Sequence, residues 1–232
     1  MNNEIKVLDH GYVKLIEIYG SDERIVEAAR MSTNKGFLGW GTLEKPGDEK
    51  LLKYLYEHKH MTPFEMAGMI IEIQAPIFVF REWHRHRTQS YNELSARYTP
   101  LPNLNYIPTI ERIMINAGTS NKQAGTIKDA EVLNEHEARD FQEKTMTIYN
   151  NLEYLYQEFL KKGIPKELAR IILPVGRYSR MRASANLRNW LAFLTLRIAK
   201  EAQWEIRQYA NVVGQLISEN FPRTWELFNN TK

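Results

Sequence analysis

Residues 81–98 read Arg81-Glu-Trp-His-Arg-His-Arg-Thr-Gln-Ser-Tyr-Asn-Glu-Leu-Ser-Ala-Arg-Tyr98 and hold four Arg and two His. At its centre lies Arg85-His86-Arg87, which is followed by seven residues and then by Ser95. Arginine clusters suit phosphate and carboxylate groups, because each guanidinium can donate two parallel hydrogen bonds. Cations at a helix end, where they complement the dipole, would explain one or two of these charges but not the whole run. The segment therefore predicts a ligand with several acceptor groups, or two ligands.

A second basic region lies further along the chain. Between Leu168 and Lys200 there is no Asp or Glu, although the net charge of the whole chain is only +3. The cations of this region are Arg170, Arg177, Arg180, Arg182, Arg188, Arg197 and Lys200. A solvated face or internal ion pairs would account for one such cluster, whereas two acid-poor clusters in one small chain favour an anionic ligand.

The composition narrows the class of protein. A chain of 232 residues, 43% hydrophobic and 25% charged, can bury a sizeable core without covalent cross-links. It contains no Cys, which excludes disulfides, thiolate metal sites and a thiolate nucleophile. We expect no secretory signal, and the longest apolar stretch, 67–80, is too short and too interrupted to span a membrane. A cytoplasmic protein that binds no membrane is the simplest expectation.

The pattern of apolar residues predicts an α+β protein in which helices predominate. A capped helix is expected after Ser21, and a strand over 69–73 should lead through Pro76 into a helix to about Arg87. Residues 36–47 are rich in Gly but lack the Lys of a phosphate-binding loop, so we expect an ordinary loop there. The other expected elements are helices over 48–58, 131–162, 186–199 and 202–220, loops over 88–108 and 115–125, a strand over 176–185 and a final turn over 222–228.

The segment around Arg85 resembles the signature of the flavin-dependent thymidylate synthases, in which Arg-His-Arg is followed by seven residues and Ser. Further blocks resemble that family in the same order: His60–Glu65, Ala75–Phe78, Ser90–Glu93, Ala169–Pro174, Asn186–Arg188, Leu196–Arg197 and Ala202–Ile206. The resemblance is tight over 60–98 and 163–210 and nearly silent over 105–160. Ordered agreement of this many blocks is more specific than a single motif.

The resemblance implies an α+β fold of the family's own kind over a single domain, 1–232, with helices on a small mixed or antiparallel sheet and no Rossmann fold. It implies reductive methylation of dUMP to dTMP, with 5,10-methylenetetrahydrofolate as carbon donor, NADPH as reductant and bound FAD as redox carrier. It also implies a homotetramer whose active sites are shared between subunits. Neither a metal ion nor a nucleic acid is expected to bind.

The resemblance also assigns site residues position by position. It implies flavin contacts for Thr62, Glu65, Arg85, His86, Arg87, Glu93, Asn186, Arg188 and Ala192. It implies nucleotide contacts for Glu82, Arg85, Glu93, Leu94, Ser95, Ala96, Arg97, Arg170 and Arg197, and the forks of Arg97 and Arg170 suit a 5′-phosphate. Arg197 would contact the uracil ring, where a cation favours negative charge on the activated pyrimidine. His60 would lie near the flavin, with a role in catalysis or folate binding.

Three positions depart from the pattern of the family. Glu82 stands where some relatives carry Gln, and its charge would repel a phosphate unless it pairs with an Arg or contacts the ribose. Ala192 replaces a polar residue that can contact the flavin, so one hydrogen bond is expected to be missing. Glu201 stands where a relative carries His.

Several positions also have a simpler structural interpretation. Thr62 could simply be the start of a helix, and Asn186 could simply be a helix cap, with no ligand contact for either. Tyr91 could pack instead of stacking on a ligand ring, and Trp204 is expected in the core. The arginines without a place in the family pattern are expected to face a neighbouring subunit or water: Arg177, Arg180 and Arg182.

The residues alone leave two other function classes open. A nucleic-acid-binding module would use the Arg-rich helices and interleaved aromatic residues, but would leave the block at 60–65 unexplained. A metal-dependent phosphohydrolase would use His58, His60, His84, His86 and Glu93, which lack a recognisable ligand spacing. In a thymidylate synthase without Cys, Ser95 is expected to bind and not to attack, because no His or Asp is placed by sequence to activate it.

Overall fold

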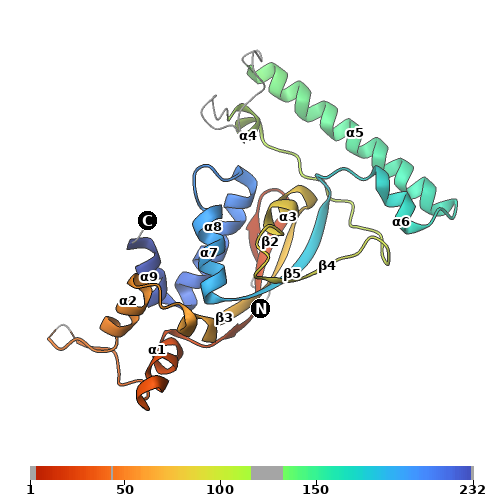
Figure 1. Ribbon diagram of the computed structural model, residues 1–232. Coiled ribbons are helices and arrows are strands. Elements are labelled where there is room, and N and C mark those ends of the chain that lie inside the picture. The colour runs from red at the N-terminus through yellow and green to blue at the C-terminus, as the bar shows by residue number, and fades with distance from the viewer. Residues whose placement is uncertain (1–3, 43, 116–132, 231–232) are drawn as a thin grey trace.

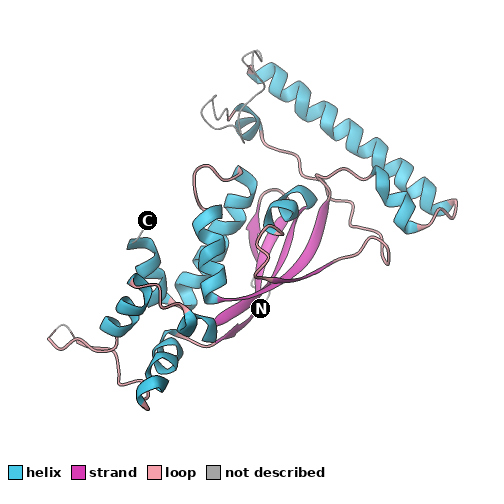
Figure 2. Cartoon of the chain, viewed as in Figure 1, coloured by secondary structure: helices cyan, strands magenta, loops and turns pink. Residues whose placement is uncertain are grey.

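The computed structural model of the protein describes residues 4–42, 44–115 and 133–230. Five strands within these residues form an antiparallel sheet in the order β1-β2-β3-β5-β4 (Figures 1 and 2). The strands are β1 (Glu4–Val7), β2 (Gly11–Tyr19), β3 (Gly68–Pro76), β4 (Ser90–Glu93) and β5 (Tyr178–Asn186). The arrangement confirms the predicted α+β class, since a Rossmann fold is built on a mostly parallel sheet.

Buried apolar residues alternate with polar residues along the central strands, so the two faces of the sheet differ. Ile71 and Ile73 of β3 are fully buried, whereas Glu72 between them points to the opposite face. On that face the register places Glu72 opposite Lys14 of β2 and Arg182 of β5, and Nε of Arg182 lies 3.2 Å from the carboxylate. Cross-strand pairs of opposite charge stabilise this register. One face of the sheet is therefore polar, and the other is apolar and packs on helices.

Three helices pack against the apolar face: α3 (Ile77–Trp83), α7 (Leu187–Arg197) and α8 (Trp204–Asn220) (Figure 1). Their buried aromatic side chains meet in the core, where the rings of Trp83 and Phe193 stack with centroids 4.6 Å apart. Large aromatic groups contribute much of the apolar burial that stabilises such a core. Because α3 follows β3 directly and α7 follows β5 directly, this packing fixes both helices relative to the paired central strands.

The remaining helices of the body lie beside one end of the sheet (Figure 1). They are α1 (Asp22–Arg30), α2 (Glu49–Glu57) and α9 (Pro222–Asn230), with the short 3-10 helices η1 (Met31–Thr33) and η2 (Thr62–Met66). The predicted cap is confirmed, because the Ser21 side chain accepts a hydrogen bond from the backbone N–H of Arg24 at 3.3 Å.

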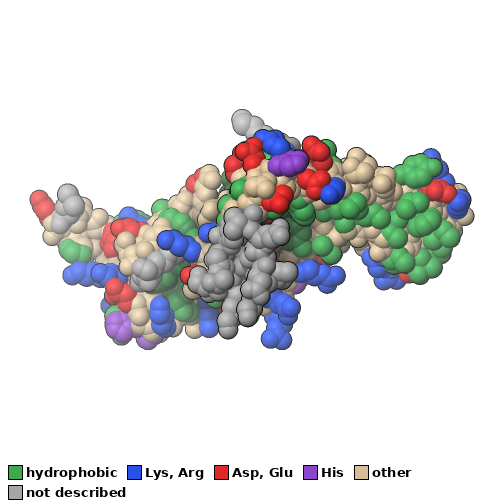
Figure 3. Space-filling view, turned by 90° about the horizontal axis from the view of Figure 1, so that it is seen from above, with side chains coloured by type: hydrophobic (Ala, Val, Ile, Leu, Met, Phe, Trp, Pro, Cys, Tyr) green, Lys and Arg blue, Asp and Glu red, His purple; other side chains and the backbone are tan. Residues whose placement is uncertain are grey.

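Helices α4 (Ile110–Met114), α5 (Glu135–Lys161) and α6 (Lys166–Ala169) form an arm that extends away from the sheet and leads into the 3-10 helix η3 (Arg170–Ile172) (Figure 1). Within α5, Ala138 and Tyr156 alone are buried. Apolar side chains gather on the surface of the arm (Figure 3), and the exposed ones include Phe141, Ile148, Tyr154 and Ile171. Exposed apolar surface of this kind marks an interaction face.

The helix predicted after Pro76 ends at Trp83 and not at about Arg87. The cause is a contact made from outside the helix. The Tyr91 hydroxyl lies 2.7 Å from the carbonyl oxygen of His86 and 3.2 Å from that of Trp83. Carbonyls at the end of a helix need such partners, and here they hold the following chain in a turn. The Arg-His-Arg signature therefore lies beyond the helix and not on it.

Three other predicted boundaries differ from the structure. The helix predicted over 131–162 begins at Glu135, the loop predicted over 88–108 includes β4, and the final turn predicted over 222–228 is α9. The polar loop predicted over 115–125 lies outside the described residues beyond its first position.

Arg177 does not face water or a neighbouring subunit as predicted, since its side chain is 1% exposed. Its Nη2 lies 2.7 Å from the Glu153 carboxylate on α5 and 3.3 Å from the carbonyl oxygen of Leu101. Its Nη1 donates to Oδ1 of Asn103 at 3.0 Å. The buried guanidinium thus joins the arm to the start of β5 and to the loop after β4.

Candidate active site

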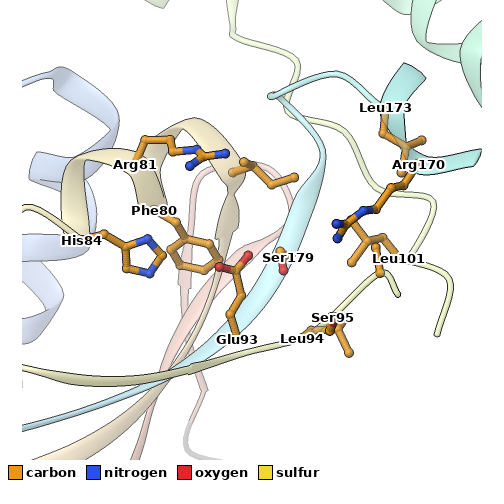
Figure 4. A pocket seen from close by; sticks show the side chains of 12 residues that line it. Phe80, Arg81, His84, Glu93, Leu94, Ser95, Leu101, Arg170, Leu173 and Ser179 are labelled. Atoms are coloured by element: carbon orange, nitrogen blue, oxygen red, sulfur yellow. The ribbon is translucent and has the colours of Figure 1, made fainter. Parts of the chain in front are cut away.

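A pocket of about 360 Å³ lies between α3, the end of β4, the start of β5 and η3 (Figure 4). Its lining residues are Ile77, Phe80, Arg81, His84, Glu93, Leu94, Ser95, Ala96, Leu101, Arg170, Leu173 and Ser179. Five residues predicted to contact the nucleotide meet here: Glu93, Leu94, Ser95, Ala96 and Arg170. They come from segments more than 70 residues apart in the sequence, so the fold and not the chain order assembles them.

Helical spacing explains the first wall of the pocket. Ile77, Phe80, Arg81 and His84 follow one another at intervals of three, one and three residues, which places them on one side of α3. Glu82 lies on a different side of the same helix and does not line the pocket.

The register of the sheet explains the second wall. Glu93 at the end of β4 pairs with Met181 on β5, and the N–H of Leu94 continues the ladder to the carbonyl of Arg180 at 2.8 Å. The chain then turns, with a 3.3 Å hydrogen bond from the backbone N–H of Arg97 to Oγ of Ser95. This turn brings Ser95 next to the start of β5.

Two cations face the interior of the pocket from opposite sides. Figure 4 shows the guanidinium groups of Arg81 and Arg170 directed inward, with the carboxylate of Glu93 between the two walls. Neither Arg81 nor Arg170 has a carboxylate within ion-pair distance among the described residues. Two unpaired guanidinium groups against one carboxylate favour an anionic ligand.

A second cluster forms where the ends of α3 and α7 meet. Nη1 of Arg197 lies 2.8 Å from the Glu82 carboxylate, and Nη2 donates to the Glu82 carbonyl oxygen at 2.9 Å. Nε of Arg197 donates to Nε2 of His86, also at 2.9 Å. Glu82 is therefore paired with an Arg, which removes the repulsion that its charge would otherwise exert on an anionic nucleotide.

His86 is held in its neutral form by this arrangement. Its Nε2 accepts a hydrogen bond from Arg197, so the ring proton lies on Nδ1. Burial of the ring and the charge of Arg197 lower the pKa of His86 from 6.5 to about 4, against the opposite effect of Glu82. The signature His is therefore a neutral group at physiological pH.

We expect this depressed pKa to make the free energy of unfolding depend on pH. Between the unfolded-state pKa of 6.5 and the folded-state pKa of about 4, the unfolded chain binds more protons, so stability falls as pH is lowered. Urea unfolding at about pH 7 and about pH 4.5 should show a larger loss for the wild type than for His86→Gln. An NMR titration that places the His86 midpoint at or above its ordinary value would contradict the expectation.

Four of the residues predicted to contact the flavin lie around η2 and the start of α7: Thr62, Glu65, Asn186 and Arg188. Glu65 and Arg188 form an ion pair at 2.5 Å. Oδ1 of Asn186 accepts from the backbone N–H of Asn189 at 3.0 Å, which confirms Asn186 as a helix cap. Thr62 is the first residue of η2, so it also begins a helix.

Arg85 and Arg87 are exposed on the turn that Tyr91 stabilises. Neither guanidinium makes an ion pair or hydrogen bond within the described part of the chain. Burial raises the pKa of Tyr91 to about 12, so its hydroxyl stays protonated and keeps donating to the backbone of the turn. Tyr91 packs, as its simpler interpretation predicts, and leaves both signature arginines available for a ligand.

Three predicted site residues lie outside all of these clusters in the chain. Arg97 is exposed, with Nε 3.6 Å from the Glu167 carboxylate on α6. His60 is exposed, and its ring forms a T-shaped pair with the ring of Tyr54 at a centroid distance of 5.7 Å. Ala192 is exposed on α7.

Three polar residues of the pocket were not among the predicted site residues: Arg81, His84 and Ser179. Arg81 and His84 lie on the same side of the helix as Phe80. Their spacing in the sequence is helical, so the sequence alone would have placed them together. Ser179 has no such local signal, because its position follows from the pairing of β5 with β3 and β4.

Within the described ranges, no group of three or more His, Asp, Glu or Cys side chains is arranged to hold a metal ion. No helix in those ranges is long and apolar enough to cross a bilayer.

Comparison with known proteins places the chain in a family. A family model described as "Thymidylate synthase complementing protein" matches residues 14–223. A flavin-dependent thymidylate synthase of Thermus thermophilus is 40% identical over 226 residues, which cover 97% of this chain and 77% of the relative. The chain belongs to the flavin-dependent thymidylate synthase family. A second member of that family, from Thermosipho melanesiensis, is 38% identical over 228 residues, covering 97% of this chain and 93% of the relative.

A solved structure of another protein has the same fold as this member of the flavin-dependent thymidylate synthase family. The UMP/dUMP methylase PolB from Streptomyces cacaoi, bound with 5-Br dUMP, superposes with a TM-score of 0.82 at 29% identity. The match covers 97% of both chains. The family, the enzyme class and the fold predicted from the signature around Arg85 are thereby confirmed.

Proposed function

We propose that this enzyme converts dUMP to dTMP, with FAD as redox carrier. The methylene would come from 5,10-methylenetetrahydrofolate and the reducing equivalents from NADPH, and tetrahydrofolate would be released. The observation that carries the proposal is the pocket in which Ser95, Glu93 and Arg170 meet, with a second unpaired guanidinium from Arg81. Its size and positive charge suit a nucleoside monophosphate, and the similar PolB structure is described as bound with 5-Br dUMP.

In the pocket, the phosphate would lie between Ser95 and Arg170. Oγ of Ser95 already accepts from the backbone of the same turn, and its hydroxyl proton is available to a phosphate oxygen. Arg170 supplies a guanidinium fork. Leu94 and Ala96 would contact the nucleotide from the same segment, and Arg97 would complete the phosphate site.

Arg197, held by Glu82 and His86, would be the cation at the uracil ring. Its side chain is 14% exposed, so a charge that develops on the pyrimidine would meet a cation in poorly solvated surroundings. Such a preorganised charge stabilises an anionic transition state without reorganisation. His60 is proposed as a further group near the reacting centre.

The residues present fit a flavin. Exposed, unpaired Arg85 and Arg87 suit its diphosphate, and the polar side chains of Thr62, Glu65, Asn186 and Arg188 lie on the neighbouring segments η2 and α7. His86 and Glu93 are proposed as further contacts, with Ala192 adding only surface. When bound, FAD supplies the hydride chemistry that this chain's own side chains lack.

The proposed site residues fall into separate clusters within one chain, which supports assembly of the active site from several subunits of a homotetramer. The exposed apolar side chains of the arm, among them Phe141 and Tyr154, offer the surface that such an assembly would bury. We further propose that residues 1–232 act as one domain, in the cytoplasm.

The enzyme has no Cys, so the uracil ring cannot be activated by a thiol adduct. Among the described residues, no His or carboxylate side chain is hydrogen-bonded to the Ser95 hydroxyl, so nothing there activates it as a nucleophile. Its proposed role is to bind the phosphate.

Replacing Ser95 by Ala should raise the KM for dUMP about tenfold and leave turnover at saturating dUMP measurable. The lost interaction is a hydrogen bond to a charged oxygen, made equally in the ground state and the transition state. Steady-state kinetics with varied dUMP tests this. Complete loss of turnover with intact dUMP binding would instead make Ser95 a nucleophile.

The proposed reaction is tested by an assay for dTMP formation from dUMP with methylenetetrahydrofolate, NADPH and FAD, each omitted in turn. Every omission should abolish product, and the purified protein should turn yellow with FAD and change its flavin spectrum when dUMP is added. A protein that remains colourless with FAD and forms no dTMP would refute the proposal.

A further inference from the structure

Ser179 combines deep burial with an unused hydroxyl. The residue is 1% exposed, and its Oγ has no hydrogen-bond partner among the described residues. Buried hydroxyls are nearly always hydrogen-bonded, because leaving one unpaired costs free energy. Of the buried side-chain atoms that lack a partner in the described residues, this one alone belongs to a residue that lines the pocket. An unused donor at that place points to a ligand.

The sheet places Ser179 beside the proposed phosphate site. It pairs with Ala75 on β3, and the β4–β5 register, extended two residues past Glu93, would bring Ser95 opposite it. Figure 4 shows Ser179 between Glu93 and the inward-pointing guanidinium of Arg170. Its hydroxyl is therefore located between two groups that the proposed function assigns to the nucleotide.

We propose that Ser179 binds the nucleotide, with its hydroxyl donating a hydrogen bond to the 5′-phosphate between Ser95 and Arg170. This inference rests on the proposed function. A phosphate oxygen is the better match for the hydroxyl than a ring atom, because Ser95 and Arg170, which line the pocket together with Ser179, offer a second hydroxyl and a guanidinium to the same group.

Titrations with dUMP and with deoxyuridine, which lacks the phosphate, test the assignment on the FAD-loaded enzyme. Ser179→Ala should weaken dUMP binding about tenfold and leave the binding of deoxyuridine, measured by competition, unchanged. Ser184→Ala is the matched control, because Ser184 lies on the same strand, points to the opposite face and does not line the pocket. That control should bind both ligands like the wild type.

The other outcomes separate the two proposals. If the wild type itself does not bind dUMP, the proposed function fails. If the wild type binds dUMP and Ser179→Ala binds it equally well, or if the variant loses affinity for dUMP and deoxyuridine alike, the phosphate contact is refuted. Without nucleotide, the thermal midpoint of Ser179→Ala should equal or exceed that of the wild type, because the variant removes an unpaired buried hydroxyl. If Ser179→Ala fails to fold, Ser179→Gly is titrated in its place with the same expected results.

Discussion

Arg197→Ala should lower turnover about 10²- to 10³-fold, the loss typical of removing one preorganised donor from a charge that develops in the transition state. The guanidinium uses all three of its nitrogens on Glu82 and His86, so its position is fixed before substrate binds. Removing it also leaves the Glu82 carboxylate without its partner near an anionic nucleotide. Both effects oppose the build-up of negative charge on the pyrimidine.

The matched control is Arg182→Ala, since Arg182 is 59% exposed on the polar face of the sheet and pairs with Glu72 there. Turnover at saturating dUMP and the flavin content of each variant should be measured together, so that loss of cofactor is not read as loss of catalysis. The control should keep wild-type turnover. If the Arg197→Ala enzyme binds flavin and turns over as fast as the control, Arg197 has no role in the mechanism.

The motif around Arg85 predicts the family, and with it helices packed on a small mixed or antiparallel sheet, because its residues and spacing are tied to one fold. It does not predict the end of α3. No Gly or Pro follows Trp83 before Pro100 to mark a stop, and the stop comes from the Tyr91 hydroxyl, which reaches back across the turn. A contact between segments has no signature in local periodicity.

The sequence likewise predicts only part of the candidate site. Ser95 and Arg170 follow from the family pattern, and the structure brings them to one pocket. Ser179 and Arg177 do not follow from it, because a Ser in a strand, or an Arg just before one, gives no indication of what its neighbours in space supply. Contacts distant in sequence decide both: the pairing of β5 with β3 leaves one hydroxyl unused in the pocket, and packing against Glu153 of α5 buries one guanidinium beside the arm.

Glu153→Ala should destabilise the protein by about 3–5 kcal/mol, the usual effect of removing one partner from a buried ion pair. Arg177 is 1% exposed and Glu153 is 13% exposed, so the remaining guanidinium would stay buried without a counter-charge. Its other contacts, to Asn103 and the carbonyl of Leu101, are neutral acceptors and cannot replace the carboxylate. For a chain of this length the change corresponds to a fall in Tm of roughly 10 °C.

Glu158→Ala provides the control on the same helix. Glu158 pairs with Lys162, whose side chain is 64% exposed, and a surface pair of this kind contributes at most about 1 kcal/mol. A double variant, Glu153→Leu with Arg177→Leu, should recover most of the stability, because it removes both charges and fills the space with apolar groups. Calorimetric unfolding of all forms at one protein concentration decides the question. If Glu153→Ala has the same Tm as the Glu158→Ala control, the Glu153–Arg177 pair does not hold the arm to the sheet. If the Tm of Glu153→Ala lies far below that of the control and the double variant recovers the stability, the unpaired charge of Arg177 is the cause. Leu101, which lines the pocket and accepts a hydrogen bond from the same guanidinium, is then held in place through Arg177.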